Sequence, residues 1–254
     1  MGAIFTIAKR DFLAFFRSIK GSAVFWFFLL FLGVFFHSFI FTFVELEKKA
    51  GAMGGEIPTL EQLIAAIFNN INFILLLVIP AVTMATFSEE KKNKVIKLLE
   101  ASPVSATQIV LGKFFAGIGM MLIVLISSMV FPLYLVRYGN PDIGVLISSY
   151  LGIFLLICFQ ISFGIWVSSM TKNQFISFLF TMFGLFLLLI LNWIAPNITS
   201  REGTEGIVRY LASTTHLESF FKGMINVSDV VYFIIFTLMF LFLTNVVLDS
   251  RRWR

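Results

Sequence analysis

Charge, cysteine and histidine are all scarce in this sequence. Charged residues make up only 13% of the 254 residues, against roughly 25% in a soluble domain. Together with an apolar share of 59%, this excludes a soluble fold with a hydrated surface and also a disordered chain. The single cysteine, Cys158, excludes an intrachain disulfide framework and any CxxC motif. The two histidines, His37 and His216, are too far apart to suggest a metal site, and packing or hydrogen bonding explains each more simply.

Enzyme motifs are lacking as well. The Gly112–Lys113 pair is followed by Phe114, and Thr107 stands where a Walker A motif needs its first glycine. No G-x-S-x-G nucleophile motif occurs. Glu89 and Glu90, followed by Lys94, have a faint likeness to the motif of membrane glutamate proteases, but the histidine partners of those enzymes are absent. We therefore expect no catalytic residue, metal site or cofactor in this chain.

Long apolar runs are abundant instead. A membrane-spanning helix needs about 20 consecutive, mostly apolar residues, and six stretches of this sequence qualify. They run from Ser22 to Val44, Leu63 to Phe87, Ile109 to Val136, Ile143 to Val167, Phe175 to Ala195 and Val230 to Val247. We predict an all-α polytopic membrane protein with six transmembrane helices, forming a single domain over residues 1–254.

The positive charges orient these spans, because Lys and Arg near short loops stay on the cytoplasmic side. With the N-terminus inside, 13 of the 19 Lys and Arg residues fall on the inner side and the other 6 on the outer side. An even number of spans then leaves both termini in the cytoplasm. Membrane topology explains the excess of basic over acidic residues, so no nucleic-acid partner is required.

The segment 1–20 precedes the first span and is amphipathic. One helical face is apolar and carries Ile4, Ala8, Phe12, Phe15, Phe16 and Ile19. The cations lie elsewhere on the helix and are Lys9, Arg10, Arg17 and Lys20. This pattern predicts an elbow helix in the cytoplasmic interface, with its cations near anionic headgroups. A frayed extension of the first span is the alternative.

The inner connection 88–113 begins with a charged segment. Ser88 is a candidate N-cap, and Glu89 and Glu90 fall in the first turn, where the helix dipole favours acidic side chains. Glu90 and Lys94 form an i,i+4 pair in the favourable order. We predict a short charged helix held against the cytoplasmic face.

A defined break follows this helix. Pro103 ends it, because the residue before a proline is disfavoured in the helical conformation. Ser105 and Gln108 match a capping box, so the next helix is expected to begin there.

The outer connection 196–229 is too long for a turn and too apolar for a solvated loop. Its apolar residues recur at helical spacing and are Ile207, Val208, Leu211, Leu217, Phe220, Phe221, Met224 and Ile225. Polar residues interrupt them before either half could cross a bilayer. We expect one or two short re-entrant helices that pack on the bundle or on a second subunit.

No charge lies deep within any of the six predicted spans. Ion-coupled pumps and carriers usually place ionisable residues there. If this chain moves something, the energy is therefore expected to enter from outside the bundle, through the charged inner helix.

The stretch from Thr86 to Gly117 resembles the connection between the second and third spans of ABC-2 type permeases. The matching positions are Glu89, Glu90, Leu98, Leu99, Ser102, Pro103, Ser105, Gly112 and Lys113. The run from His216 to Arg254, with its closing Ser-Arg-Arg-Trp, looks like the end of the gliding-motility GldF-like branch of that family. Lys94-Val95-Ile96 departs from the Gly-Thr-Leu of many relatives, which leaves the identity of the ATPase open.

This resemblance implies the transmembrane permease subunit of an ATP-driven ABC transporter, an exporter of a bacterial cytoplasmic (inner) membrane. Two permease subunits, alike or different, would stand over two ABC nucleotide-binding ATPase subunits, which would hold the ATP and Mg²⁺. A coupling helix would dock in the ATPase. By the resemblance, the residues that couple to the ATPase are Glu89, Glu90, Lys94, Leu98, Leu99, Ser102 and Pro103.

The resemblance also implies a pathway along the second and fifth spans. The candidate pathway residues are Asn69, Asn70, Asn72, Thr83 and Thr86. The 33 Phe residues suit an apolar or amphipathic cargo, but lipid contact and helix packing explain them equally well. The asparagines are equally suited to interhelical hydrogen bonds.

Two other functions are compatible with the sequence. One is a mechanical or scaffold subunit of an ABC complex, which has no transported cargo and works on an extracytoplasmic partner protein. The other is a stand-alone channel or membrane enzyme, active without any ATPase. The simplest alternative for Glu89 and Glu90 is helix capping alone.

Overall fold

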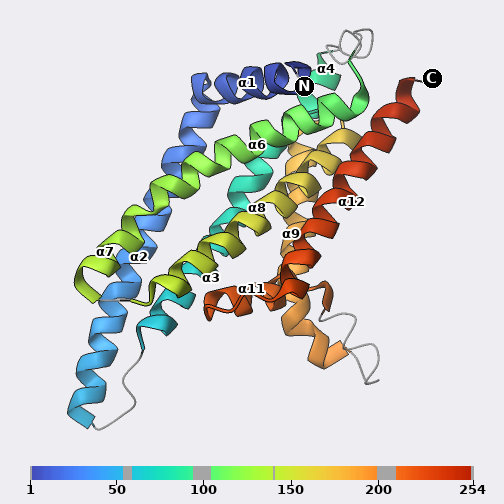
Figure 1. Ribbon diagram of the computed structural model, residues 1–254. Coiled ribbons are helices and arrows are strands. Elements are labelled where there is room, and N and C mark those ends of the chain that lie inside the picture. Colours follow the sequence, from blue (N-terminus) through green and yellow to red (C-terminus); the bar gives the residue numbers. More distant parts are fainter. Residues whose placement is uncertain (1, 54–58, 94–103, 140, 199–209, 253–254) are drawn as a thin grey trace.

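The computed structural model describes residues 2–53, 59–93, 104–139, 141–198 and 210–252, and these ranges are helical without any strand (Figure 1). The helices are α1 Gly2–Arg17, α2 Ile19–Met53, α3 Leu60–Thr83, α4 Ser88–Lys92, α6 Ala106–Ser128, α7 Val130–Gly139, α8 Ile143–Met170, α9 Gln174–Ile198, α11 Ser213–Phe221 and α12 Val227–Arg252. Both termini and α4 lie at one end of the bundle, and α11 lies toward the other.

The six predicted spans are confirmed. Helical segments long and apolar enough to cross a membrane are Gly21–Ala50, Leu60–Lys92, Ala106–Arg137, Ile143–Met170, Gln174–Asn192 and Val227–Ser250. Each includes most of the corresponding run expected from the sequence. The third consists of α6 and α7, which meet at Met129.

Local sequence signals fix where the spans begin. Ser105 Oγ accepts a hydrogen bond from Gln108 N at 3.2 Å, and Ser105 N donates to Gln108 Oε1 at 3.1 Å, which confirms the predicted capping box. Thr59 and Gln62 form a second such box at the start of α3. Because these caps satisfy otherwise unpaired N–H groups, they define the first turns of α3 and α6.

The core of the bundle is built by α3, α6 and α8, which are buried over more than half of their apolar windows. Helices α2 and α9 lie at the periphery and expose most of their length, including Trp26, Phe27, Phe180 and Phe183. These rings are free to contact lipid or a second subunit, and lipid contact is one of the explanations given above for the Phe-rich composition.

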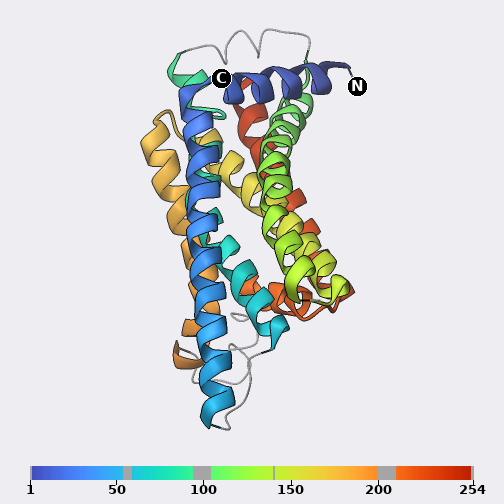
Figure 2. The same ribbon diagram turned by 90° about the vertical axis from the view of Figure 1, so that its left-hand side faces the viewer.

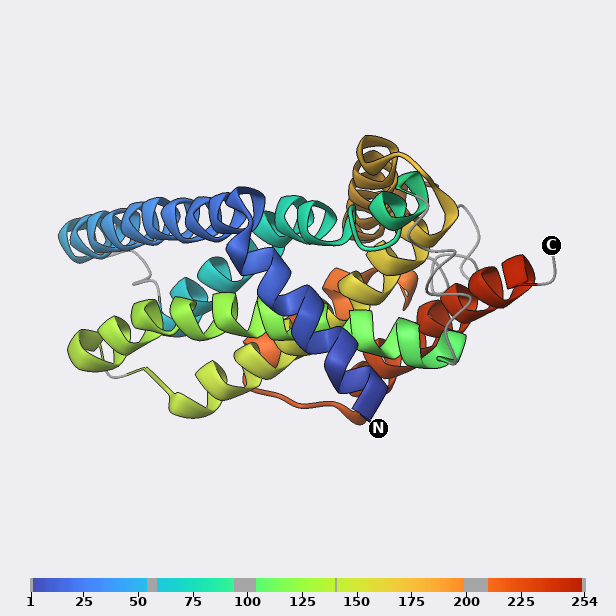
Figure 3. The same cartoon turned by 90° about the horizontal axis from the view of Figure 1, so that it is seen from above.

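Helix α1 lies across α6 at the end of the bundle that carries the termini (Figures 1 and 3). A close approach makes this crossing possible, since a Cβ added to Gly112 would come within 2.8 Å of Ile7 Cβ. Phe12, Phe15 and Phe16 pack against the core. Ile19, expected on the same apolar face, instead begins α2 and is exposed, because α1 ends at Arg17 and the chain turns there.

Within the outer connection 196–229, the described part contains one short helix, α11, which packs on α8, α9 and α3. Phe220 lies against Gly152 of α8, where an added Cβ would be 2.8 Å from the Phe220 side chain. Gly223 then adopts a φ of 81°, a conformation that favours glycine, and the chain enters α12. Leu217 and Phe221 are buried as the spacing predicted, whereas Met224 and Ile225 are exposed.

Candidate functional site

Helix α4 continues the second span after a turn at Met84–Phe87, and α8 holds its first turn in place. Ser168 Oγ accepts hydrogen bonds from Phe87 N at 3.1 Å and Ser88 N at 3.2 Å. The prediction of Ser88 as N-cap is therefore wrong. Ser88 is the first helical residue, and its hydroxyl donates back to Met84 O, because Ser168 already satisfies the free N–H groups.

A second contact fixes α4 to the same part of α8. Lys91 is buried, and its Nζ donates to Ser169 O near the carboxyl end of α8. The helix dipole places partial negative charge there, so a cation is favoured at this position. Helix α4 is thus attached to α8 at both its start and its fourth residue.

The opposite side of α4 enters a cluster of four charged side chains from three helices. Lys113 Nζ of α6 lies 2.8 Å from Glu90 Oε1 and 3.1 Å from Asp11 Oδ2 of α1. Arg10 Nη2 lies 2.8 Å from Asp11 Oδ1 and 3.3 Å from Glu90 Oε1. Two cations and two carboxylates alternate, so the ion cluster of Arg10, Asp11, Glu90 and Lys113 is formally neutral.

Lys113 is the buried centre of this ion cluster. Its side chain is 2% exposed, against 16% for Glu90 and 20% for Asp11. The ammonium also lies 5.1 Å from the centre of the Phe87 ring. A buried ammonium is costly unless it is paired, so Lys113 holds α1 and α4 to α6. Glu90 Oε2 is buried without a hydrogen-bond partner among the described residues.

In the ion cluster, Glu90 has other partners than the one predicted from the sequence. Glu90 pairs with Lys113 and Arg10, and the expected partner Lys94 lies outside the described residues. Glu89 lies in α4 as expected, and its carboxylate has no partner in the described part of the chain. The remaining residues predicted to couple to the ATPase also fall outside the described ranges: Leu98, Leu99, Ser102 and Pro103.

The candidate pathway residues do not converge. Thr83 and Thr86 lie near α4, whereas the three asparagines lie about 20 Å away along α3. Asn69 is exposed and donates to Ala65 O at 3.0 Å, and Asn72 is buried. Asn70 Oδ1 is buried without a partner among the described residues.

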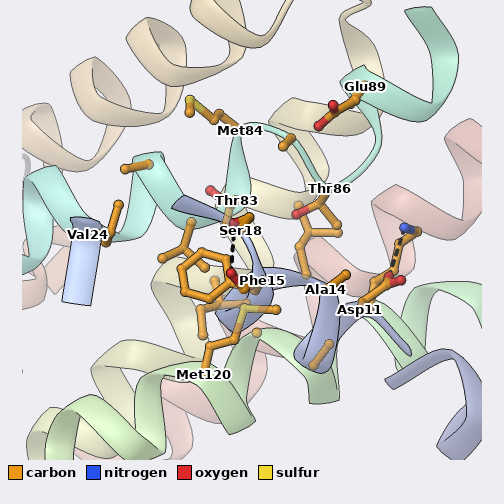
Figure 4. A pocket seen from close by; sticks show the side chains of 18 of the residues that line it. Asp11, Ala14, Phe15, Ser18, Val24, Thr83, Met84, Thr86, Glu89 and Met120 are labelled. Carbon is orange, nitrogen blue, oxygen red and sulfur yellow. Dashed lines mark hydrogen bonds and ion pairs between the residues drawn. The ribbon is translucent and has the colours of Figure 1, made fainter. Parts of the chain in front are cut away.

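A cavity of about 530 Å³ lies between α1, α3, α6 and α8 beside the ion cluster (Figure 4). Thr83 and Thr86 line it, so the structure brings these two predicted residues together. Thr83 is buried, donates to Ile79 O at 2.9 Å and packs against Gly164. Glu89 and Glu90 border the same cavity.

Sequence reasoning missed the parts played by Arg10, Asp11 and Ser168. Asp11 is the sole acidic residue before Glu45, and Lys113 is a lone cation within an apolar run. An unpaired charge at such positions is a signal for an ion pair. The sequence does not reveal the pairing between helices, because the paired residues lie 23, 80 and 102 positions apart in the chain.

A separate polar contact joins α11 to α12, toward the other end of the bundle. His216 Nδ1 of α11 lies 2.7 Å from Asp229 Oδ1 of α12, and Nε2 lies 2.9 Å from Tyr210 O. The ring stacks on Tyr232, with centroids 3.9 Å apart. Both partners are acceptors, so the imidazole donates both hydrogen bonds only when each nitrogen carries a proton. His216 is thus packed and hydrogen-bonded, as predicted.

The sequence profile described as ABC-2 family transporter protein matches residues 16–188, which is more than half of the chain. No curated protein matches the chain. The matched region begins in α1, ends in α9 and contains α4 and Lys113. The six apolar helices agree with an integral, multi-pass membrane protein, and the family consists of membrane transport subunits that work with an ABC ATPase. The chain belongs to the ABC-2 family of transporter proteins.

Proposed function

We propose that this chain is the permease subunit of an ATP-driven exporter, and that a separate ATPase subunit binds at the end of the bundle that carries α1 and α4. The excess of positive charge at this end supports a cytoplasmic orientation for it and for both termini. A bacterial inner membrane is the expected location. The likeness of residues 216–254 to the GldF-like branch supports placement there.

The ion cluster is the observation that carries this proposal. Residues 94–103, which resemble the coupling region of the family, follow directly after α4. Glu90 joins α4 to Lys113 of α6 and Arg10 of α1, and Ser168 joins it to α8. An ATPase that displaces α4 would therefore act directly on the spans α6 and α8 and on the elbow helix α1.

The physical chemistry of the cluster favours movement as one unit. Separating Glu90 from Lys113 would leave an ammonium that is 2% exposed with one carboxylate fewer. Removing one partner of a buried ion pair costs about 3–5 kcal/mol. ATP-driven displacement of α4 is therefore expected to carry α1 and α6 with it, and so to change access to the interior of the spans.

A second permease subunit completes the proposed complex. The peripheral helices α2 and α9 expose large apolar side chains, which suit either lipid or a partner subunit of like or different sequence. In such a dimer, Asn69, Asn70, Asn72, Thr83 and Thr86 are the candidate pathway residues. The apolar composition favours an apolar or amphipathic cargo.

Extraction and identification of bound subunits test the proposal first. We expect a tagged chain, gently extracted from its native membrane, to bring a stoichiometric subunit with a Walker A motif. In that complex, Glu89→Ala with Glu90→Ala should leave membrane insertion intact and reduce ATP turnover. Glu61→Ala, an exposed change at the opposite end of the bundle, is the control.

Two results would overturn the coupling proposal. One is a folded chain that emerges without any ATPase and is active alone, as a channel or membrane enzyme would be. The other is turnover in the double variant equal to that of the wild type. An intact complex that retains a large extracytoplasmic partner and moves no cargo would support mechanical work in place of export.

A further inference from the structure

The cavity of about 530 Å³ has apolar walls and one acidic edge (Figure 4). Phe15 of α1, Val24 of α2 and Met120 of α6 belong to the apolar lining, together with Ile161 and Ile165 of α8. Known small-molecule sites are concave, mostly apolar, and range over roughly 300–1,000 Å³. The size and the walls of this cavity therefore suit a compact apolar molecule.

The charges at the acidic edge do not balance. Asp11, Glu89, Glu90 and Lys113 line the cavity, which makes three carboxylates against one ammonium. Including Arg10 of the ion cluster still leaves one negative charge in excess. The carboxylate of Glu89, a half-buried residue, has no partner among the described residues, and the Glu90 Oε2 atom is buried without one. The surplus charge therefore lies on the carboxylates of α4.

The opening of the cavity is at the joint between α1 and α2. Ile19 lines the cavity and is itself 89% exposed, so the cavity reaches the surface beside it. The amphipathic α1 borders the same opening. If α1 lies at the membrane surface, molecules enter from the level of the headgroups, where amphiphiles concentrate.

We propose that this cavity binds one organic cation with an apolar body, whose positive charge lies against Glu89 and the free oxygen of Glu90. An anion would meet three carboxylates and a single ammonium that is already paired, and a neutral apolar molecule would desolvate Glu89 without compensation. A hard metal ion requires six or more oxygen ligands or waters, but Asp11 and Glu90 are already engaged with Lys113. A bulky monovalent cation matches the cavity in both respects: its apolar body contacts the apolar walls, and its charge balances the one surplus carboxylate.

This binding site does not depend on the proposed export function. Tetraphenylphosphonium is the probe, because its charge is permanent and its body apolar, and tetraphenylborate has the same shape with the opposite charge. We expect the full chain, purified in a non-ionic detergent, to bind one phosphonium saturably in equilibrium dialysis. The borate should neither bind at this site nor displace the phosphonium.

Two variants localise the binding. Glu89→Gln should weaken phosphonium binding about tenfold or more, the loss of one charge-assisted contact. Ala14→Phe should abolish it, because exposed Ala14 lines the cavity and a ring there fills the space. Asp249→Asn and Leu13→Phe are the matched controls, since neither residue lines the cavity, and both should bind as the wild type does.

The outcomes separate clearly. Phosphonium and borate binding alike, no saturable phosphonium binding, or unchanged affinity in Glu89→Gln would each overturn the proposal. If binding is as expected, competition with lipids added to the micelles identifies the natural source of the cation. Displacement by phosphatidylethanolamine and not by phosphatidylglycerol indicates an ammonium-bearing lipid, and displacement by neither indicates a soluble amphiphilic amine.

Discussion

Replacement of Lys113 by methionine tests the ion cluster directly. Methionine keeps an unbranched apolar stem and removes the ammonium that holds Asp11 and Glu90 together. Removing one member of a buried ion pair costs about 3–5 kcal/mol. The two carboxylates are 20% and 16% exposed, so water can relieve part of the cost. We therefore expect the lower end, about 3 kcal/mol.

This cost should appear as opening of α1, which lies on α6 through the cluster and through Gly112. A change of about 3 kcal/mol corresponds to an increase on the order of 100-fold in the opened population. Hydrogen exchange of α1 amides, measured by mass spectrometry on the purified chain in detergent, reports this population. Lys172→Met is the control, because Lys172 is exposed in the connection between α8 and α9.

A triple variant separates electrostatics from packing. Lys113→Met with Asp11→Asn and Glu90→Gln removes both unpaired carboxylates and leaves charged only Arg10, whose side chain is half exposed. Replacing the buried members of an ion group by neutral residues is often close to neutral in stability. Exchange in α1 should therefore return most of the way to wild type. The reasoning is refuted if the single variant stays within threefold of wild type, or if the triple variant opens as much as the single one.

Three further changes test other contacts. Ser168→Val leaves two N–H groups at the start of α4 without an acceptor, costing about 1–3 kcal/mol and speeding exchange in α4; Ser177→Ala, whose hydroxyl is buried without a partner among the described residues, should change nothing. His216→Ala removes one buried and one partly buried hydrogen bond and should lower the free energy of unfolding in detergent by about 2–4 kcal/mol. The exposed change Glu218→Gln should be neutral, and equal melting temperatures for the two variants would contradict the role of His216. Gly112→Val forces a side chain into α1 at a cost of about 1–3 kcal/mol and should expose α1 to protease; resistance equal to wild type would argue against the close crossing.

Much of the membrane architecture could be predicted from the sequence. All six spans follow from runs of about 20 apolar residues, since the hydrocarbon core imposes that length on any helix that crosses it. The capping box of Ser105 and Gln108 was also predictable, because it depends on residues three apart. Two roles stay predictions: that the outer connection is re-entrant, and that the inner connection contains a coupling helix.

The candidate site was predicted only in part. Glu89 and Glu90 were found because they are adjacent acids outside the spans, and the family resemblance includes them. The partner of Glu90 was predicted as Lys94, one turn along the same helix, because local spacing is all that a single sequence offers. In the structure its partners are Arg10 and Lys113, which lie 80 and 23 residues away.

The sequence by itself thus determined which segments cross the membrane, where helix α6 begins, and which end carries the positive charge. These properties depend on hydrophobicity and on contacts between near neighbours in the chain. Only the tertiary structure decided that Ser168 caps α4, that Lys113 unites three helices, and that a cavity with surplus carboxylate charge lies beside them. Each of these depends on how helices cross, and crossing is set by packing at positions such as Gly112, which brings distant residues to within a few ångströms of one another.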